Sequence, residues 1–317
     1  MGRLKIHTPG PYTSIQDAGR TGYQALGVPE GGAVDPPARI IANWLVSRSA
    51  DAAGFEIFIG GLSFTTDSHL AVAMTGVTSD TITVTDTSGQ TTTHAAGQTI
   101  YLHSGDTLTI PPLRSSNLAF LALSARFDLP AVFGSVGVSA NARIGGLDGA
   151  MLKAGDEVSL TDITAEPVRR ELTPELNNIF TPADTFRVVP GPQDFCFETP
   201  EIDKLYSTDW RLTTRMDRMG LRLSGPALKH RQSADILSDG IVKGAIQIPG
   251  DGQPIILMAD HQTTGGYTKI ATVISADLAR LTRLAPHKTV RFSAVSQQEA
   301  EEIARAQARL INTYLIE

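Results

Sequence analysis

A long series of short, β-branched segments constrains this chain more than any other feature. Glycine, proline, aspartate or serine closes each segment. β-Branched and aromatic residues favour strands, and the 29 glycines and 18 prolines of the 317 residues suit many turns. The segments lie at residues 69–76, 80–87, 98–112, 116–125, 156–162, 185–191, 244–250, 254–260, 269–275 and 289–295. This pattern predicts a mainly β protein built of barrels or sandwiches.

Few helices are expected. Residues 35–47 begin with Asp35 as a candidate N-cap and Pro36 at the first helical position, where proline is tolerated. A C-terminal helix begins near Ser296, because Ser296 and Glu299 have the spacing of a capping box. Shorter helical stretches are expected within 173–180 and 275–284.

Composition excludes several classes of protein. The chain is 41% hydrophobic and 19% charged, with a mean hydropathy of -0.03 and a net charge of -6. A mildly acidic chain without a basic stripe predicts no nucleic-acid partner. No apolar run reaches the length of a membrane span, and residues 1–17 show no signal-peptide pattern. With Cys196 as the lone cysteine, a cytoplasmic location is expected.

The chain divides near a polar, proline-bearing stretch at residues 163–185. Two domains are therefore predicted, an N-terminal β-barrel-like domain at 1–170 and a C-terminal β-barrel domain at 171–317.

A first group of candidate site residues lies between Ser14 and Asp35. Glycines in this stretch allow close backbone approach, and arginine suits carboxylates and phosphates. The alternative is a run of tight turns with a surface pair, in which the aspartate at 35 only caps a helix. The stretch matches neither a P-loop nor a dinucleotide fingerprint. The candidates are Gln16, Asp17, Arg20, Gly31, Gly32 and Asp35.

Two further groups follow in the second half. Arg215, Asp217 and Arg218 lie in the segment 213–226, which otherwise predicts an exposed hairpin with arginines outward and leucines inward. Gln247 lies in an apolar strand, where a buried amide needs a partner. It either holds a neighbouring loop or meets a ligand.

A polar insert, ADHQTTGGYTK at residues 259–269, separates two apolar strands. A hairpin needs only two to five loop residues, so this insert carries more hydrogen-bonding groups than a turn requires. Polar loops held by rigid strands often form sites. The alternative is a satisfied internal network.

Motifs for other chemistry are missing. The seven histidines are scattered, and no HExxH, CxxC or GxSxG pattern occurs. No metal site is evident, and no biotin-acceptor lysine is present.

Four segments together resemble the allophanate hydrolase subunit 2 family, also called the biotin-dependent carboxyltransferase family. The resemblance runs from about residue 10 to 274 and implies cyclophilin-like β-barrel units, with one at 171–317. The segments are SIQDAGRTGYQALGVPEGGAVDPPARIIAN, VPGPQDF, RMDRMGLRL and KGAIQIPGDGQPIILMADHQTTGGYTKIATV.

The resemblance also implies activity and partners. The main expectation is the C-subunit role in a bacterial 5-oxoprolinase-type complex, an amide (lactam) hydrolase that converts 5-oxoproline to glutamate with ATP. Its partners would be a subunit-1-type protein (the B-type component of 5-oxoprolinase, or a Kip inhibitor-like protein) and a third subunit. ATP would act through the complex. The alternatives are a carboxyltransferase component of a biotin-dependent urea or amide carboxylase, with biotin on a partner, and a non-catalytic antagonist of a Kip-inhibitor-like regulator.

Residue roles follow from the resemblance. Asp260 would orient or deprotonate the substrate amide, with Arg20 and Gln262 as the other catalytic candidates. The remaining substrate-binding candidates are Thr263, Thr264, Gly265, Gly266 and Tyr267. Two departures from the family pattern occur, the segment GSVGVSANARIGG at 134–146 and Thr268, where proline is common.

Overall fold

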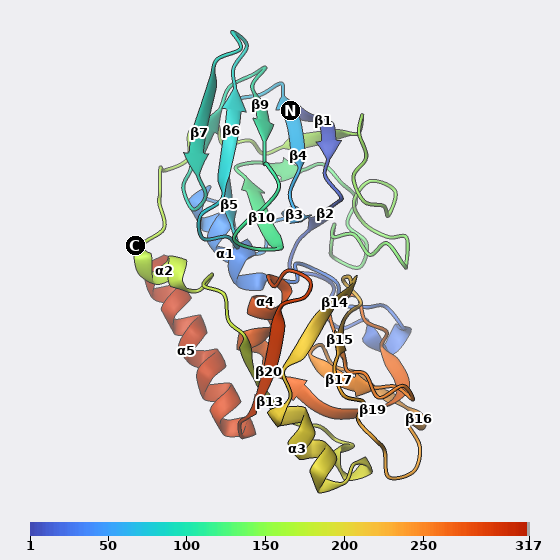
Figure 1. Ribbon diagram of the computed structural model, residues 1–317. Coiled ribbons are helices and arrows are strands. Elements are labelled where there is room, and N and C mark those ends of the chain that lie inside the picture. The colour runs from blue at the N-terminus through green and yellow to red at the C-terminus, as the bar shows by residue number, and fades with distance from the viewer. Residues whose placement is uncertain (316–317) are drawn as a thin grey trace. The chain divides into compact units, whose positions relative to one another are not determined.

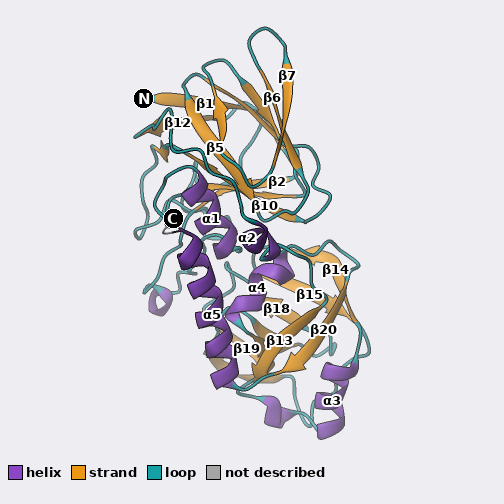
Figure 2. Ribbon diagram, turned by 90° about the vertical axis from the view of Figure 1, so that its left-hand side faces the viewer, coloured by secondary structure: helices purple, strands orange, loops and turns teal. Residues whose placement is uncertain are grey.

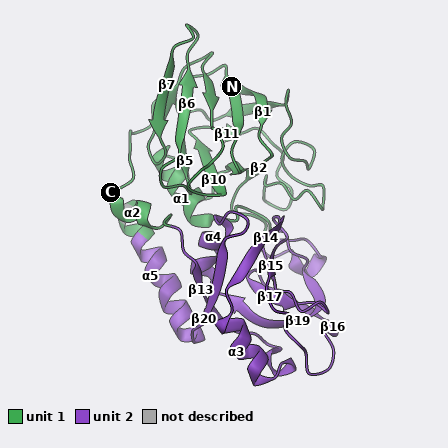
Figure 3. Cartoon of the chain, viewed as in Figure 1, with its two compact units in different colours: residues 1–20, 31–181, 311–317 green, residues 21–30, 182–310 purple. Residues whose placement is uncertain are grey.

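The computed structural model describes residues 1–315 and divides into two compact units (Figures 1 and 3). Unit 1 comprises Met1–Arg20, Gly31–Thr181 and Ile311–Glu317, and unit 2 comprises Thr21–Glu30 and Pro182–Leu310. The predicted division into domains at 1–170 and 171–317 stays a prediction.

Unit 1 contains two antiparallel sheets and two helices. Its elements are β1 (Gly2–Pro9), β2 (Tyr12–Gln16), α1 (Pro36–Leu45), β3 (Gly54–Phe58), β4 (Leu62–Thr66), β5 (Leu70–Thr75), β6 (Thr81–Thr85), β7 (Thr91–Ala95), β8 (Ile100–Leu102), β9 (Thr107–Thr109), β10 (Leu118–Leu123), β11 (Arg126–Phe127), β12 (Glu157–Thr161) and α2 (Pro174–Asn178). One sheet has the order β11-β12-β1-β4-β9-β6-β7, and the other β2-β3-β10-β5-β8.

The five-stranded sheet is covered on both faces, and β10 shows how. Leu121 and Leu123 belong to the main core, to which both sheets contribute. Phe120 and Ala122 belong to a second cluster with residues of α1, which packs along β10 (Figure 2). Side chains alternate across a strand, so a strand buried on both faces needs an unbroken apolar sequence. All six residues of β10 are accordingly buried.

Helix α1 begins as the sequence predicts. Asp35 accepts a hydrogen bond from the backbone N–H of Ala38 at 2.9 Å, and Pro36 is the first helical residue. Ile41 and Leu45 of this helix are fully buried. The capping interaction therefore satisfies a helix-end donor at the point where the chain turns into the core.

Unit 2 is built from the remaining elements. These are η1 (Gln24–Leu26), β13 (Thr185–Pro190), η2 (Asp194–Cys196), α3 (Thr199–Ser207), β14 (Trp210–Met216), β15 (Gly220–Ser224), β16 (Asp235–Gly240), β17 (Ala245–Ile248), β18 (Ile255–Leu257), β19 (Thr264–Val273), α4 (Ser275–Thr282), β20 (Thr289–Ala294) and α5 (Gln297–Leu315), the last of which belongs to this unit through Leu310.

The strands of unit 2 form a closed ring. Their order is β13-β20-β14-β15-β18-β17-β19-β16, and β13 also pairs with β19, so the first seven strands close on themselves and β16 is attached outside. Val188 of β13 is opposite Val273 of β19. The pairing of β13 with β20 is parallel. A closed ring leaves no open edge among its own strands.

The mainly β fold class with few helices is confirmed. The C-terminal helix α5 also begins with the predicted capping box, because the N–H of Ser296 donates to a Glu299 carboxylate oxygen at 2.7 Å and the N–H of Glu299 donates to Ser296 Oγ at 3.2 Å.

Candidate functional site

The first group of predicted residues forms a buried polar cluster in unit 1, here called the Asp17 cluster: Gln16, Asp17, Arg20 and the loop 132–146. Asp17 Oδ1 accepts from Ser135 Oγ at 2.6 Å and from the N–H of Gly19 at 2.9 Å. Asp17 Oδ2 accepts from the N–H of Val136 at 2.8 Å. The carboxylate therefore fastens the loop to the end of β2.

Gln16 and Arg20 contact the same loop. The Gln16 amide donates to Val138 O at 2.9 Å, while Arg20 donates to Val132 O at 3.2 Å and to Gly137 O. Both side chains are fully buried, so Arg20 does not belong to a surface pair. Gln16 Oε1 is buried and has no hydrogen-bond partner within residues 1–315.

Gly31 and Gly32 complete this region through their backbone. Their φ angles are 63° and 74°, a conformation that glycine adopts without steric cost. A Cβ on Gly32 would lie 2.8 Å from the carbonyl of Ala18, and the next residue, Ala33, donates its N–H to Asp17 O at 2.9 Å. The atypical segment 134–146 is thus a bonding partner of the first motif, which no local pattern in the sequence indicates.

Arg218 and Asp260 form a buried ion pair in unit 2. Arg218 Nε lies 2.9 Å from Asp260 Oδ2, and Nη2 lies 3.0 Å from Oδ1. The two side chains are 1% and 5% exposed, and the N–H of Asp260 donates to Arg218 O at 2.8 Å. Two parallel bonds of this kind give a fixed geometry. The pair joins the β14–β15 turn to the segment after β18, and a role of Asp260 toward a substrate amide stays a prediction.

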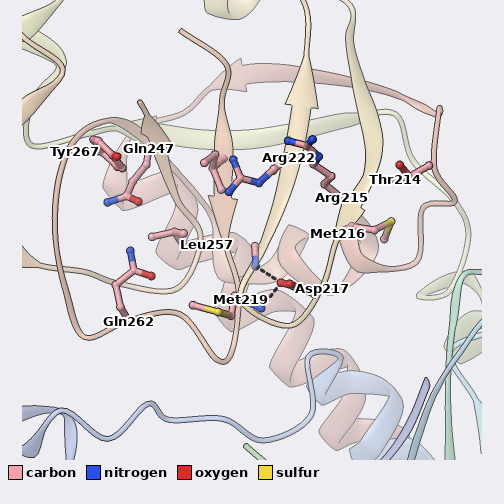
Figure 4. A pocket seen from close by; sticks show the side chains of 12 residues that line it. Thr214, Arg215, Met216, Asp217, Met219, Arg222, Gln247, Leu257, Gln262 and Tyr267 are labelled. Carbon is pink, nitrogen blue, oxygen red and sulfur yellow. Dashed lines mark hydrogen bonds between the residues drawn. The ribbon is translucent and has the colours of Figure 1, made fainter. Parts of the chain in front are cut away.

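A pocket of about 470 Å³ lies on the outer face of the unit 2 ring (Figure 4). Leu221 and Ile256 face the core, so their neighbours Arg222 and Ile255 face outward. The pocket is lined by Thr214, Arg215, Met216, Asp217, Met219, Gly220, Arg222, Gln247, Ile255, Leu257, Gln262 and Tyr267.

One wall of the pocket carries positive charge. Arg215 and Arg222 come from the β14–β15 hairpin (Figure 4), and neither guanidinium has an ion-pair or hydrogen-bond partner among the described residues. Asp217 does not neutralise them by contact, because its Oδ1 accepts from the N–H groups of Met219 and Gly220 at 2.8 and 3.0 Å. The aspartate shapes the turn, and the arginines are left to attract an anion.

The opposite side of the pocket carries amide groups. Gln247 is 2% exposed, and its Nε2 has no hydrogen-bond partner within residues 1–315. The register of β17 and β19 shifts between Ile246 and Gln247, which is a bulge of the kind that re-aims side chains near sites. Gln262 and Tyr267 lie on the same side (Figure 4).

The polar insert at 259–269 is used in two ways. Gln262 and Tyr267 line the pocket. The backbone from Thr264 to Tyr267 also pairs with β16, with Gly240 opposite Thr264 and Asp235 opposite Tyr267. The N–H of Ile241 donates to Thr263 O at 3.1 Å. Direct roles of 263–266 in substrate binding stay a prediction.

Several pocket residues were not singled out from the sequence. Arg222 is the most notable of them. Its alternation with the buried Leu221 and Leu223 is the sequence pattern that indicates an outward-facing arginine. Thr214 and Met219 belong to the same hairpin as Arg215 but have no distinctive local pattern. Leu257 reaches the pocket through the pairing of β15 with β18, in which it is opposite Gly220.

Thr268, where the resemblance predicts a proline, uses the N–H that a proline lacks. This N–H donates to Ala234 O at 3.1 Å, and Thr268 Oγ1 lies 2.9 Å from His230 Nε2. Burial lowers the pKa of His230 below its usual value. The substitution therefore fastens β19 to the segment that precedes β16.

Residues 1–315 contain neither a metal-binding cluster nor a membrane-spanning helix. No cluster of three or more His, Cys, Asp or Glu side chains there could hold a metal ion. None of the described helices is both long and apolar enough to cross a bilayer.

Comparison with known proteins defines the class. A family described as the carboxyltransferase domain, subdomain A and B, matches residues 26–294, and the chain belongs to this family. The predicted resemblance is thereby confirmed.

Two bacterial relatives match along nearly their whole length. Both bear the name of the C subunit of 5-oxoprolinase. The chain is 33% identical to the Escherichia coli protein over 96% of each chain. It is 31% identical to the Haemophilus influenzae protein over 92% of this chain and 91% of that one.

A solved structure also shares the fold. The urea carboxylase of Kluyveromyces lactis has a TM-score of 0.88 and 26% identity over 98% of this chain, which spans 29% of that enzyme. The homologues are therefore subunits of a hydrolase complex and part of a larger carboxylase.

Proposed function

We propose that this protein is the C-type subunit of a 5-oxoprolinase-type complex, which hydrolyses 5-oxoproline to glutamate with ATP. The likeness to the 5-oxoprolinase C subunit of Escherichia coli carries the proposal, because it extends over 96% of both chains. By contrast, the carboxylase likeness covers a fraction of a longer enzyme.

The chemistry of the pocket supports this substrate. 5-Oxoproline carries a carboxylate and a lactam, and the pocket offers Arg215 and Arg222 for the former and Gln247 and Gln262 for the latter. Its volume suits a small molecule. Among the catalytic candidates, Gln262 is the one that lines this pocket. Asp260 and Arg20 act in this proposal by holding loops in place.

The proposal includes a partner and a compartment. Met219 and Tyr267 are 36% and 40% exposed at the pocket, and exposed apolar surface beside a pocket suits a covering protein. A subunit-1-type protein is the proposed partner, with a third subunit. ATP is assigned to the complex, since this sequence has no P-loop pattern. A cytoplasmic location is proposed because one cysteine forms no intrachain disulfide.

A second candidate is carboxyl transfer to a small amide, with biotin carried by a partner. The TM-score of 0.88 with a urea carboxylase favours it. In this case the two pocket arginines would meet the transferred carboxylate.

The test is reconstitution. The chain is co-purified with the subunit-1-type protein and the third subunit of the same organism, and glutamate release from 5-oxoproline and ATP is measured with and without avidin. Avidin-insensitive release is expected. Avidin-sensitive turnover would favour the second candidate, and a stable complex without turnover in any mixture would favour a regulatory antagonist and overturn both.

A further inference from the structure

The pocket contains a buried hydrogen-bond donor that the fold itself does not use. Gln247 is 2% exposed, and its Nε2 has no partner within residues 1–315. A buried amide without a hydrogen bond destabilises the folded protein, so native structures pair nearly all such groups. Gln247 lines the pocket, and its amide is therefore a candidate donor to a ligand there.

Gly265 keeps the space beside this donor open. A Cβ on Gly265 would lie 3.1 Å from Gln247 Nε2 and 3.3 Å from Gln262 Nε2, so the two amide nitrogens border the same small space. The same Cβ would lie 2.6 Å from Ile241 Cδ1. Gly265 is not among the glycines with positive φ. Glycine is therefore required here because a side chain would collide with its neighbours, and not because of the backbone conformation.

The strand register places an arginine at a defined distance from these amides. Arg222 and Gln247 are both opposite Ile255, one on each side of β18. The three residues form one row on the outer face, and two strand spacings separate the ends by about 10 Å between backbones. Ile255 and Leu257 supply an apolar floor between a cation and an amide donor.

We infer that this row binds a small cyclic or linear amide that also carries a carboxylate. The carboxylate meets Arg222, the apolar body lies on Ile255, and the amide carbonyl oxygen accepts from Gln247 and Gln262 over Gly265. A carbonyl oxygen has two lone pairs and can accept two such bonds. The geometry requires only a carbonyl at one end and a carboxylate at the other. The choice of 5-oxoproline as the probe rests on the proposed function.

The test compares three ligands of similar size on the full chain and on the reconstituted complex. 5-Oxoproline has both groups, cyclopentanecarboxylate has only the carboxylate, and 2-pyrrolidinone has only the lactam. Dissociation constants are measured by calorimetry or ligand-observed NMR for the wild type, for Gln247→Met and for the control Gln232→Met, which alters an exposed glutamine outside the pocket.

The wild type is expected to bind 5-oxoproline more tightly than either fragment. Gln247→Met should weaken 5-oxoproline about tenfold, the scale of one lost hydrogen bond in a buried site, and leave cyclopentanecarboxylate and the Gln232→Met control unchanged. Gly265→Ala should weaken 5-oxoproline by filling the space between the amides.

Three results would overturn the inference: unchanged 5-oxoproline binding in Gln247→Met, an equal loss for cyclopentanecarboxylate, or no binding of 5-oxoproline to either preparation. These results are separate from the fate of the proposed function. Carbonyl-dependent binding without glutamate release would reject the function and keep the site. Glutamate release that Gln247→Met does not reduce would keep the function and reject the site.

Discussion

The Asp17 cluster of unit 1 and the pocket of unit 2 contain similar polar side chains, but their charged groups differ in how they are bonded. In the cluster, both oxygens of Asp17 accept hydrogen bonds from the loop 132–146 or its own turn. In the pocket, the guanidinium groups of Arg215 and Arg222 and the Nε2 of Gln247 have no partners among the described residues. The bonded polar groups of the cluster thus hold the fold together, whereas the unbonded groups of the pocket are the ones that we propose bind a ligand.

The largest expected effect concerns the ion pair between Arg218 and Asp260. This pair lies in the same unit as the pocket, but its charged groups are hydrogen-bonded to each other, as the Asp17 carboxylate is bonded within its cluster. Arg218→Met should lower the free energy of unfolding by about 3–5 kcal/mol, because it leaves the Asp260 carboxylate buried without its partner. Chemical denaturation measures this change.

The double variant Arg218→Met/Asp260→Leu provides the control for the ion pair. It should regain much of the lost stability, because no uncompensated charge remains. If Arg218→Met were as stable as the wild type, the pair would not hold the β14–β15 turn.

A smaller loss of stability is expected in the cluster. Asp17→Asn replaces an acceptor of three hydrogen bonds and should cost about 1–3 kcal/mol. Ser135→Ala removes one of the three and should cost less. Reduced turnover of the complex at unchanged melting temperature would contradict the comparison, because it would give Asp17 a role beyond the loop.

Substitution of a pocket arginine should reduce ligand affinity and leave stability almost unchanged. Arg222→Met removes an exposed charge, so stability should stay within about 0.5 kcal/mol. Affinity for 5-oxoproline should fall about tenfold, the scale of one lost charge-assisted bond. Calorimetric binding and thermal unfolding of the same preparation separate the two quantities. A large loss of stability would place Arg222 with the structural residues.

The smallest expected effect is a dependence of stability on pH. Burial lowers the pKa of His230 below 6.5, its usual value, so below pH 6.5 the unfolded chain binds more protons than the folded one. Stability should therefore fall as the pH drops below about 6.5 and show no contribution from this group above it.

His230→Gln should flatten part of this dependence. Burial, with the charge of Arg169 second, also lowers the pKa of His94 in unit 1. His94→Gln is therefore the matched comparison. Equal pH profiles for the wild type and His230→Gln would exclude the contribution of His230.

Local features of the fold followed from the sequence, and long-range ones did not. The cap at Asp35, the capping box of Ser296 and Glu299, and the unbroken apolar run of β10 depend on neighbouring residues, so periodicity and residue type indicate them. The closure of the ring by Val188 and Val273 joins strands far apart in the chain, for which the sequence contains no local mark.

In the candidate site, too, the sequence indicates some individual residues but not the long-range pairing that brings them together. Gln247 and Arg215 were found because a polar side chain interrupted an apolar or alternating strand. Arg222 had the same signal and was not singled out. The pairing of Arg222 and Gln247 with Ile255 and the bond from Ser135 to Asp17 depend on register and loop placement, which single residues do not encode.

The order in which the units are completed has a consequence for biosynthesis. Leu176, Phe180 and Ile311 pack in one cluster with α1, yet Ile311 follows all of unit 2 in the chain. A ribosome therefore releases the final piece of the first unit only after it has made the second. Nascent chains fold progressively from the N-terminus. The part of unit 1 that is made first therefore leaves the apolar surface that Ile311 covers exposed until synthesis passes residue 311. A nascent chain stalled before residue 311 would be the species that a chaperone meets.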